Sequence, residues 1–182
     1  MNKQEKQWSG QFGNKYTLRN FNSKPKIKLK LNRSLRILEI GSNVGNQLLA
    51  LKKIGFKNLY GIEINPKSVE KAKIKNIIVG SALDIPFKDK YFDLVFTAGL
   101  LIHISPKDIR KVMKEIIRCS KKYVMGYEYY APKYQKVNYR GHKDMLWKTD
   151  FAKLYQKFNL KLINEKRFQE KEGTDTIFML SK

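Results

Sequence analysis

The chain has 182 residues and a formal net charge of +22, with 42% hydrophobic and 12% aromatic residues. This length and composition are typical of one folded domain and exclude a disordered chain. No apolar run approaches the ~20 residues of a membrane-spanning helix. The single cysteine, Cys119, excludes an internal disulfide. Because the N-terminus also lacks an apolar secretory segment, we expect a cytoplasmic protein with no membrane association and no metal.

The positive charge has two interpretations. Of the 38 basic residues, 31 are Lys and 7 are Arg, and the lysines are spread along the whole chain. Proteins that read nucleic acids rely on Arg for bidentate contacts with bases and phosphates. We therefore attribute most of the charge to surface positions filled by Lys, and RNA binding remains the alternative. The charge also attracts anionic small molecules.

The first 34 residues differ in pattern from the rest. Residues 4–20 predict a short aromatic-rich helix with a break at Gly10 or Gly13, and residues 21–34 predict a lysine-rich connection. From residue 36 onward, short apolar runs alternate with helical segments, which is typical of a parallel sheet with helices on both faces. The expected strands are 36–40, 58–64, 77–80, 92–98, 123–127, 160–165 and 175–180. The expected helices are 44–54, 66–75, 106–119 and 149–158.

Two local signals complete the predicted architecture. Ser105 can cap a helix that begins at Pro106, because Pro in the first helical position costs no hydrogen bond. The loop 166–174 is too short for a crossover helix, so the last two strands are expected to form an antiparallel hairpin. We therefore predict an α/β fold of the Rossmann-like type. Its sheet has seven strands and is mostly parallel, with an antiparallel C-terminal strand.

The most informative stretch runs from Ile37 to Asn46, where an apolar strand containing Glu39 turns sharply into a helix. Gly41 and Gly45 let the backbone approach a ligand closely, and the helix N-terminus presents free N–H groups. The spacing differs from the G-x-G-x-x-G of dinucleotide sites. Roughly 20 residues further on, Glu63 ends the second strand, where a carboxylate can accept hydrogen bonds from both ribose hydroxyls.

Together with the turn at 80–87 and the strand that Asp93 opens, these motifs resemble the class I S-adenosylmethionine-dependent methyltransferases over residues 35–125. The resemblance implies that S-adenosylmethionine is the cofactor and that Glu63 holds its ribose. Ser81 stands where many relatives carry Asp, so Asp84 becomes the second candidate partner of the adenine. The implied cofactor residues are Trp8, Phe12, Tyr16, Arg19, Glu39, Gly41, Ser42, Asn43, Gly45, Asn46, Glu63, Ile64, Ser81, Ala82, Leu83, Asp84, Thr97, Ala98 and Gly99.

A narrower resemblance is to the methylases associated with pseudaminic acid biosynthesis. It rests on Trp8–Asn20, Leu100–Pro106 and Tyr139–Phe151. It implies a small-molecule methylase whose acceptor is related to nonulosonic acids or surface polysaccharides. Within one domain, the chain then divides into an N-terminal lid (1–34), a cofactor-binding core (35–127), an acceptor-side insertion (128–150) and a C-terminal helix and hairpin (151–182).

Methyl transfer requires the protein mainly to align the acceptor and to exclude water. An acceptor amine or hydroxyl can also need a base, and the candidates are His103, Tyr129 and His142. His103 alternatively lines a pocket or caps a helix. Arg19 is expected to fold over the cofactor and pair with its carboxylate. Aromatic rings with one Arg suit an anionic acceptor, and the expected acceptor residues are Glu128, Tyr130, Tyr139, Arg140 and Trp147.

We therefore expect methyl transfer from S-adenosylmethionine to an O or N atom of a small anionic acceptor, by a monomer or homodimer. The charge suggests an RNA methyltransferase as the alternative. The Asn-Pro-Pro-Tyr motif of many nucleic-acid amine methylases is absent, however, and Thr97–Leu100 stands in its place. A third possibility is a non-catalytic subunit that keeps the cofactor fold and acts with a partner.

Overall fold

The computed structural model describes residues 1–27, 29–170 and 173–182. Its helices are α1 (Lys3–Ser9), α2 (Gln11–Asn20), α3 (Asn46–Lys53), α4 (Pro66–Glu70), the short 3-10 helix η1 (Leu101–His103), α5 (Ile109–Cys119) and α6 (Phe151–Gln156). Its strands are β1 (Arg36–Ile40), β2 (Asn58–Glu63), β3 (Ile77–Val79), β4 (Phe92–Ala98), β5 (Ser120–Tyr130), β6 (Gln135–Tyr139), β7 (His142–Lys148), β8 (Lys161–Glu170) and β9 (Gly173–Ser181).

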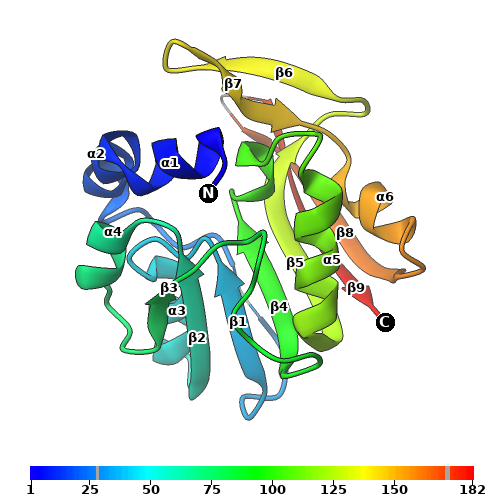
Figure 1. Ribbon diagram of the computed structural model, residues 1–182. Coiled ribbons are helices and arrows are strands. Elements are labelled where there is room, and N and C mark those ends of the chain that lie inside the picture. The colour runs from blue at the N-terminus through cyan, green and yellow to red at the C-terminus, as the bar shows by residue number, and fades with distance from the viewer. Residues whose placement is uncertain (28, 171–172) are drawn as a thin grey trace.

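Over these described ranges, seven strands form one sheet in the order β3-β2-β1-β4-β5-β9-β8 (Figure 1). Strands β1 to β5 pair in parallel. Strand β9 runs antiparallel to both β5 and β8. The predicted mostly parallel sheet with an antiparallel C-terminal strand is therefore confirmed.

Each face of the sheet buries its own apolar core. Adjacent residues point to opposite faces because side chains alternate along a strand. Ile37 of β1 therefore packs with α3, while Leu38 packs with α5 and α6. Helices on both faces leave the central strands buried on both sides, which explains their nearly continuous apolar runs. Figure 1 shows α3 behind the sheet and α5 and α6 in front of it.

Two helices, α4 and α5, differ from the sequence prediction by three residues or more at one end. Helix α5 begins at Ile109 instead of residue 106, and Ser105 does not cap it. Instead, Ser105 opens a turn in which its hydroxyl donates to the Asp108 carboxylate and its carbonyl accepts from the Ile109 amide. Helix α4 ends at Glu70, where the chain turns so that the Lys73 amide can donate to the Val44 carbonyl. The shorter α4 thus reflects a tertiary contact that outweighs local propensity, whereas the later start of α5 reflects hydrogen bonds within residues 105–109.

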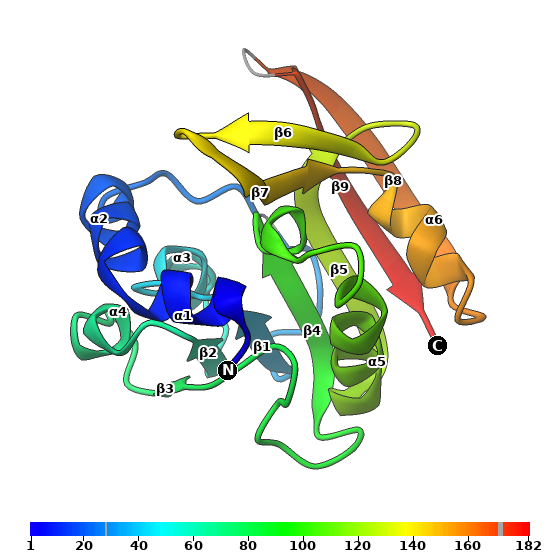
Figure 2. The ribbon, with the colours of Figure 1, turned by 45° about the horizontal axis from the view of Figure 1, so that its top comes forward.

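The acceptor-side insertion (128–150), where no strand was expected, contains a second, two-stranded sheet. Strands β6 and β7 pair antiparallel. Arg140 and Gly141 join them with positive φ angles of 52° and 81°, as a two-residue hairpin turn requires. Figure 2 shows this hairpin lying across the end of the main sheet, and β7 contacts η1. The sequence prediction missed it because Arg-Gly is not among the dipeptides that favour such a turn.

The C-terminal hairpin is longer than expected. Strand β8 ends at Glu170 and strand β9 begins at Gly173, so the two strands include most of the residues predicted to form the 166–174 loop. Residues 171–172 of that loop lie outside the described residues. Among the helices that are described, none has the length and apolar character needed to cross a membrane.

Candidate functional site

A crevice of about 160 Å³ opens where β1, β2 and β3 end. These strands are neighbours in the sheet, so the residues at their carboxyl ends lie side by side. The chain order reverses between β1 and β4, which is where open α/β sheets bind ligands. We call the strand-end residues Glu39–Asn43, Glu63 and Ser81–Leu83 the floor of the crevice. Helices α1 and α2 also line the crevice, and we call them its roof.

Glu63 is held in place by the backbone around it. Its two carboxylate oxygens accept hydrogen bonds from the Asn43 and Asn65 amides, each at 2.9 Å. Burial raises the pKa of the Glu63 carboxyl, and these backbone bonds partly offset the increase. The carboxylate therefore keeps one defined orientation at the edge of the crevice.

The Glu39 carboxylate is less well satisfied than that of Glu63. Its side chain is buried, and its Oε2 atom has no hydrogen-bond partner among the described residues. Burial, with repulsion from Glu63 added, raises the pKa of the Glu39 carboxyl well above its usual range. A buried carboxylate without a partner is unfavourable unless a cation or donor neutralises it. The floor is thus acidic, although the whole chain carries a charge of +22.

The turn after β1 brings the backbone close to the crevice. Gly41 has a φ of +71°, and a Cβ there would lie 2.8 Å from the Leu100 side chain. Gly45 has a φ of +80° and forms the N-cap of α3. A residue with a side chain would be strained at either position. The two glycines therefore close the turn tightly and leave the space above it to a ligand.

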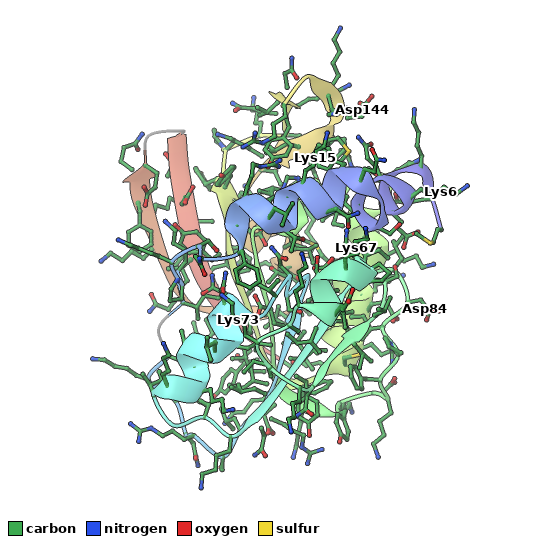
Figure 3. All side chains as sticks on the ribbon, turned by 90° about the vertical axis from the view of Figure 1, so that its left-hand side faces the viewer. Lys6, Lys15, Lys67, Lys73, Asp84 and Asp144 are labelled. Carbon is green, nitrogen blue, oxygen red and sulfur yellow. The ribbon has the colours of Figure 1, made fainter. Side chains whose placement is uncertain are left out.

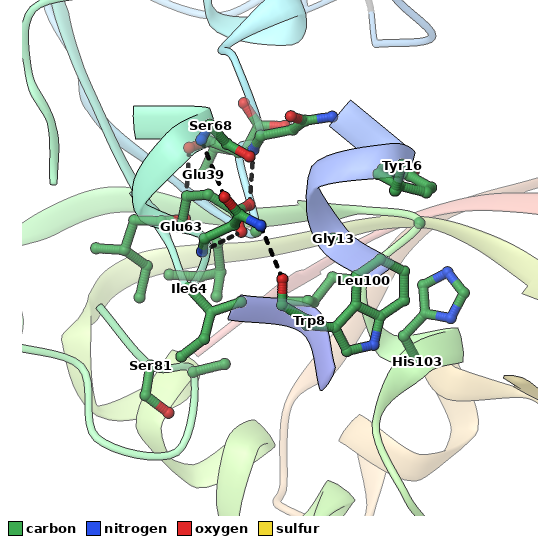
Figure 4. A pocket seen from close by; sticks show the side chains of 18 of the residues that line it. Trp8, Gly13, Tyr16, Glu39, Glu63, Ile64, Ser68, Ser81, Leu100 and His103 are labelled. Carbon is green, nitrogen blue, oxygen red and sulfur yellow. Dashed lines mark hydrogen bonds between the residues drawn. The ribbon is translucent and has the colours of Figure 1, made fainter. Parts of the chain in front are cut away.

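Trp8 of the roof lies beside His103 in the crevice (Figure 4). Asn65, in the turn after β2, fastens the roof to the main sheet. Its side-chain amide donates to the Trp8 carbonyl at 3.0 Å and to the Asn14 side chain at 2.9 Å. Its side-chain oxygen caps α4 by accepting from the Ser68 amide. Gly13 allows this approach, because a Cβ there would lie 1.7 Å from the Trp8 carbonyl oxygen.

Comparison with known proteins gives a consistent result for this core. Residues 38–124 match the family model described as a methyltransferase domain. The 24-methylenesterol C-methyltransferase 3 of Arabidopsis thaliana is 26% identical over 130 residues, covering 65% of this chain and 36% of that protein. The chain thus spans about a third of the length of this curated relative.

Solved structures agree on the architecture. An S-adenosylmethionine-dependent methyltransferase of Methanosarcina mazei has a TM-score of 0.69 at 16% identity, covering 84% of this chain and 94% of that one. The magnesium protoporphyrin IX methyltransferase of Synechocystis was solved with bound S-adenosylmethionine. It has a TM-score of 0.64 at 16% identity, and the match covers 92% of this chain and 75% of that one. The fold is that of the class I S-adenosylmethionine-dependent methyltransferases. These matches support the sequence prediction that S-adenosylmethionine is the cofactor.

The crevice suits this cofactor chemically. S-adenosylmethionine carries an ammonium and a sulfonium, and the floor offers the buried carboxylate of Glu39, with its unpartnered oxygen, and the half-buried carboxylate of Glu63. Glu39 would hold the amino group. Glu63 would accept from the ribose hydroxyls, as a carboxylate at the end of the second strand does in such folds. The narrower likeness to methylases of pseudaminic acid biosynthesis does not appear among these matches.

Most of the predicted cofactor residues of this methyltransferase fold meet in the crevice. Those that line it are Trp8, Tyr16, Glu39, Gly41, Ser42, Asn43, Asn46, Glu63, Ile64, Ser81, Ala82, Leu83, Ala98 and Gly99. Five others do not line it. Gly45 caps α3, Thr97 is buried within β4, and Phe12 packs edge-on against Trp8. Arg19 is exposed, with its guanidinium 6.0 Å from the Tyr16 ring. Asp84 is exposed and points away from the crevice (Figure 3).

The structure separates the three candidate catalytic residues. Only His103 lines the crevice. Its Nδ1 lies 2.6 Å from the Met145 carbonyl oxygen, which can only accept, so Nδ1 carries the proton and Nε2 is the basic nitrogen. Burial lowers the pKa of His103 to about 4, so the ring is neutral at physiological pH. Tyr129 contacts Lys148, and His142 is exposed, with its ring centroid 5.3 Å from that of Phe12.

The predicted acceptor residues lie beyond the crevice, around the β6–β7 hairpin. Tyr139 packs with its ring centroid 5.1 Å from that of His103, and Arg140 is exposed at the hairpin turn. Trp147 is buried, and the Tyr130 ring lies under the Arg167 guanidinium at 3.8 Å. Glu128 is fully buried, and its carboxylate accepts from the Leu100, Leu101 and Ile102 amides. The Glu128 side chain therefore holds the loop after β4, and it does not line the crevice.

Sequence reasoning missed the residues that join the roof to the floor. Asn65 and Gly13 are described above, and the Thr17 and Ser68 hydroxyls share a hydrogen bond between α2 and α4. Glu5 also lines the crevice, from α1. The only available signal was the Asn65-Pro66 pair, a typical helix start. Nothing in the sequence indicated that its side chain would also bind α1 and α2.

Proposed function

We propose that this protein transfers the methyl group of S-adenosylmethionine to an O or N atom of a small anionic acceptor. The observation that carries the proposal is the acidic crevice at the ends of β1 and β2, where Glu39 has a buried, unpartnered oxygen and Glu63 is fixed by backbone amides. A cationic adenosyl ligand satisfies both carboxylates.

In this proposal, some residues of the crevice hold the cofactor and others exclude water or accept a proton. When bound, S-adenosylmethionine supplies a methyl group already activated by the sulfonium. Trp8 and Tyr16 of the roof line the crevice. Their rings would keep water away from the bound sulfonium, which favours methyl transfer to the acceptor over reaction with water. His103, neutral and with Nε2 unprotonated, can accept a proton from an acceptor hydroxyl or ammonium. Its low pKa makes it a weak base that is always in the basic form above about pH 4.

The β6–β7 hairpin supports the assignment of the acceptor. It borders His103 through Tyr139 and carries Arg140 at its turn. A planar guanidinium can bind a carboxylate or phosphate in bidentate fashion, and the charge of +22 draws anions to the surface. These features, with the resemblance to methylases of pseudaminic acid biosynthesis, favour an acidic sugar-related acceptor over RNA.

Isothermal titration with S-adenosylmethionine tests the cofactor site. We expect one binding event per chain, weakened about 100-fold by Glu63→Ala, because two hydrogen bonds to a charged group are lost. Asp84→Ala is the matched control, since this exposed carboxylate lies off the crevice, and it should bind like the unmodified protein. Absence of binding by the unmodified protein would rule out the proposed function.

Methyl transfer to a panel of sialic-acid-like and other acidic sugars tests the acceptor. We expect Arg140→Ala to raise KM for the acceptor about tenfold and to leave cofactor affinity unchanged, because Arg140 is exposed and outside the crevice. Arg110→Ala, which removes another exposed arginine on α5, should leave KM unchanged. Methylation of RNA fragments in preference to every acidic sugar would contradict the proposed acceptor.

A further inference from the structure

One end of the crevice lies beyond Glu63, where β3 ends. Glu39, Glu63 and Ser81 lie at or just after the carboxyl ends of β1, β2 and β3, and these strands are consecutive neighbours in the sheet. An adenosyl ligand held by Glu39 and Glu63 must therefore place its base near Ser81 and Leu83. The exocyclic amino group of adenine is a hydrogen-bond donor, so this end needs an acceptor.

The acceptors on the floor at this end are already used or face elsewhere. Asp84 is exposed and does not line the crevice (Figure 3). The Ser81 hydroxyl accepts a hydrogen bond from the Leu83 amide at 3.0 Å. Another carboxylate of the crevice, Asp108, lies at the start of α5 and not at the end of β3, and its Oδ2 atom accepts from the Ser105 hydroxyl at 2.8 Å and from the Asn2 side chain at 3.2 Å.

The roof supplies the missing carboxylate. Glu5 of α1 lines the crevice, and its Oε1 atom is hydrogen-bonded to the Ser81 hydroxyl. Its Oε2 atom accepts from the Asn2 amide at 2.7 Å and completes the capping box of α1. The capping box fixes one carboxylate oxygen, and the other points at the end of β3. Glu5 is thus oriented toward the base subsite by its own helix.

We propose that Glu5 recognises the exocyclic amino group of adenine, an inference that rests on the proposed function. The Ser81 hydroxyl carries no charge, and its hydrogen bond holds the Glu5 carboxylate at the end of β3. The roof then binds the base, while Glu39 and Glu63 of the floor bind the amino group and the ribose. Binding of the base and closure of α1 become one event.

The test compares two ligands and two proteins by isothermal titration. The ligands are S-adenosylhomocysteine and its analogue with hydrogen in place of the 6-amino group. The unmodified protein should bind the amino ligand about tenfold or more tightly, and Glu5→Ala should reduce this ratio to near one. A weakened capping box lowers both affinities equally, so the ratio reports the contact with the base and not the stability of α1.

Two further variants define the outcome. Glu5→Gln keeps the capping box but lacks the charge, so its ratio should fall between those of the unmodified protein and Glu5→Ala. Asp84→Ala and Asp108→Ala should keep the full ratio. An unchanged ratio in Glu5→Ala, with both ligands still binding, would overturn this inference and leave the proposed function standing. Failure of the unmodified protein to bind either ligand would overturn both.

Discussion

The floor and the roof of the crevice are built in different ways. The floor consists of strand ends and one glycine turn, and its acidic groups Glu39 and Glu63 belong to the buried sheet. The roof consists of two short helices at the N-terminus, of which α1 has no buried residue. Side-chain contacts from Asn65 and Glu5 hold the roof in place. In the proposed function, the rigid floor selects the cofactor and the more weakly attached roof controls access to it.

The largest expected effect separates binding from stability on the floor. Glu39→Gln should lower the affinity for S-adenosylmethionine about 100-fold, because a buried carboxylate that pairs with an ammonium is lost. The same change should raise the stability of the ligand-free protein at about pH 8 by about 1 kcal/mol or more. The reason is that burial and repulsion raise the pKa of Glu39, so ionising it at alkaline pH disfavours the fold. Titration and thermal unfolding measure the two effects, and a lower melting temperature would contradict the prediction.

Glu128, which lies beneath the loop after β4, should make the free energy of unfolding depend on pH. Burial raises its pKa from 4.5 to about 7, although the backbone amides of that loop lower it in part. Because the folded pKa is raised, the stabilisation is complete below about pH 4.5 and is lost as pH rises through about 7. The loss amounts to about 3 kcal/mol. Urea unfolding across this range should show it in the unmodified protein. Glu128→Gln keeps one acceptor oxygen, for the Leu100 and Leu101 amides, and cannot ionise, so it should lack this component. Parallel curves for both proteins would refute the assignment.

Gly13→Ala tests the roof alone. Alanine normally stabilises a helix interior by about 1 kcal/mol relative to glycine, but a Cβ here would lie 1.7 Å from the Trp8 carbonyl oxygen. We expect α1 to separate from α2 and cofactor affinity to fall about tenfold, with little change in global unfolding. Gly10→Ala is the control, because its Cβ would meet its nearest neighbour at 3.1 Å. Equal affinities for the two variants would show that the roof does not contribute to binding.

The smallest effect reports whether the roof is closed. Burial lowers the pKa of His103 from 6.5 to about 4, and Trp8 of α1 packs with its ring centroid 4.6 Å from that of His103. Nuclear magnetic resonance titration of the His103 ring should give this low value in the unmodified protein. Trp8→Ala should raise the pKa toward 6.5 by exposing the ring. A value near 6.5 in both proteins would mean that the roof stands open in solution.

The comparison of floor and roof also explains which predictions succeeded. The strand that contains Glu39, the turn through Gly41 and Gly45, and the strand tip at Glu63 were all found from local patterns. Each depends on residues within one strand–turn–helix unit, where apolar alternation and positive φ leave a direct trace in the sequence. The hairpin β6–β7 left no such trace, because its turn uses Arg140 and not Asn or Asp.

The sequence by itself determined the α/β fold, its mostly parallel sheet and the positions of Glu39 and Glu63 at the strand ends. Only the tertiary structure decided that Asp84 faces solvent, that Glu5 reaches Ser81 and that Asn65 fastens the roof. The physical reason is distance along the chain. Glu5 and Ser81 are 76 residues apart, and their contact depends on how α1 packs over the sheet, which no local pattern encodes.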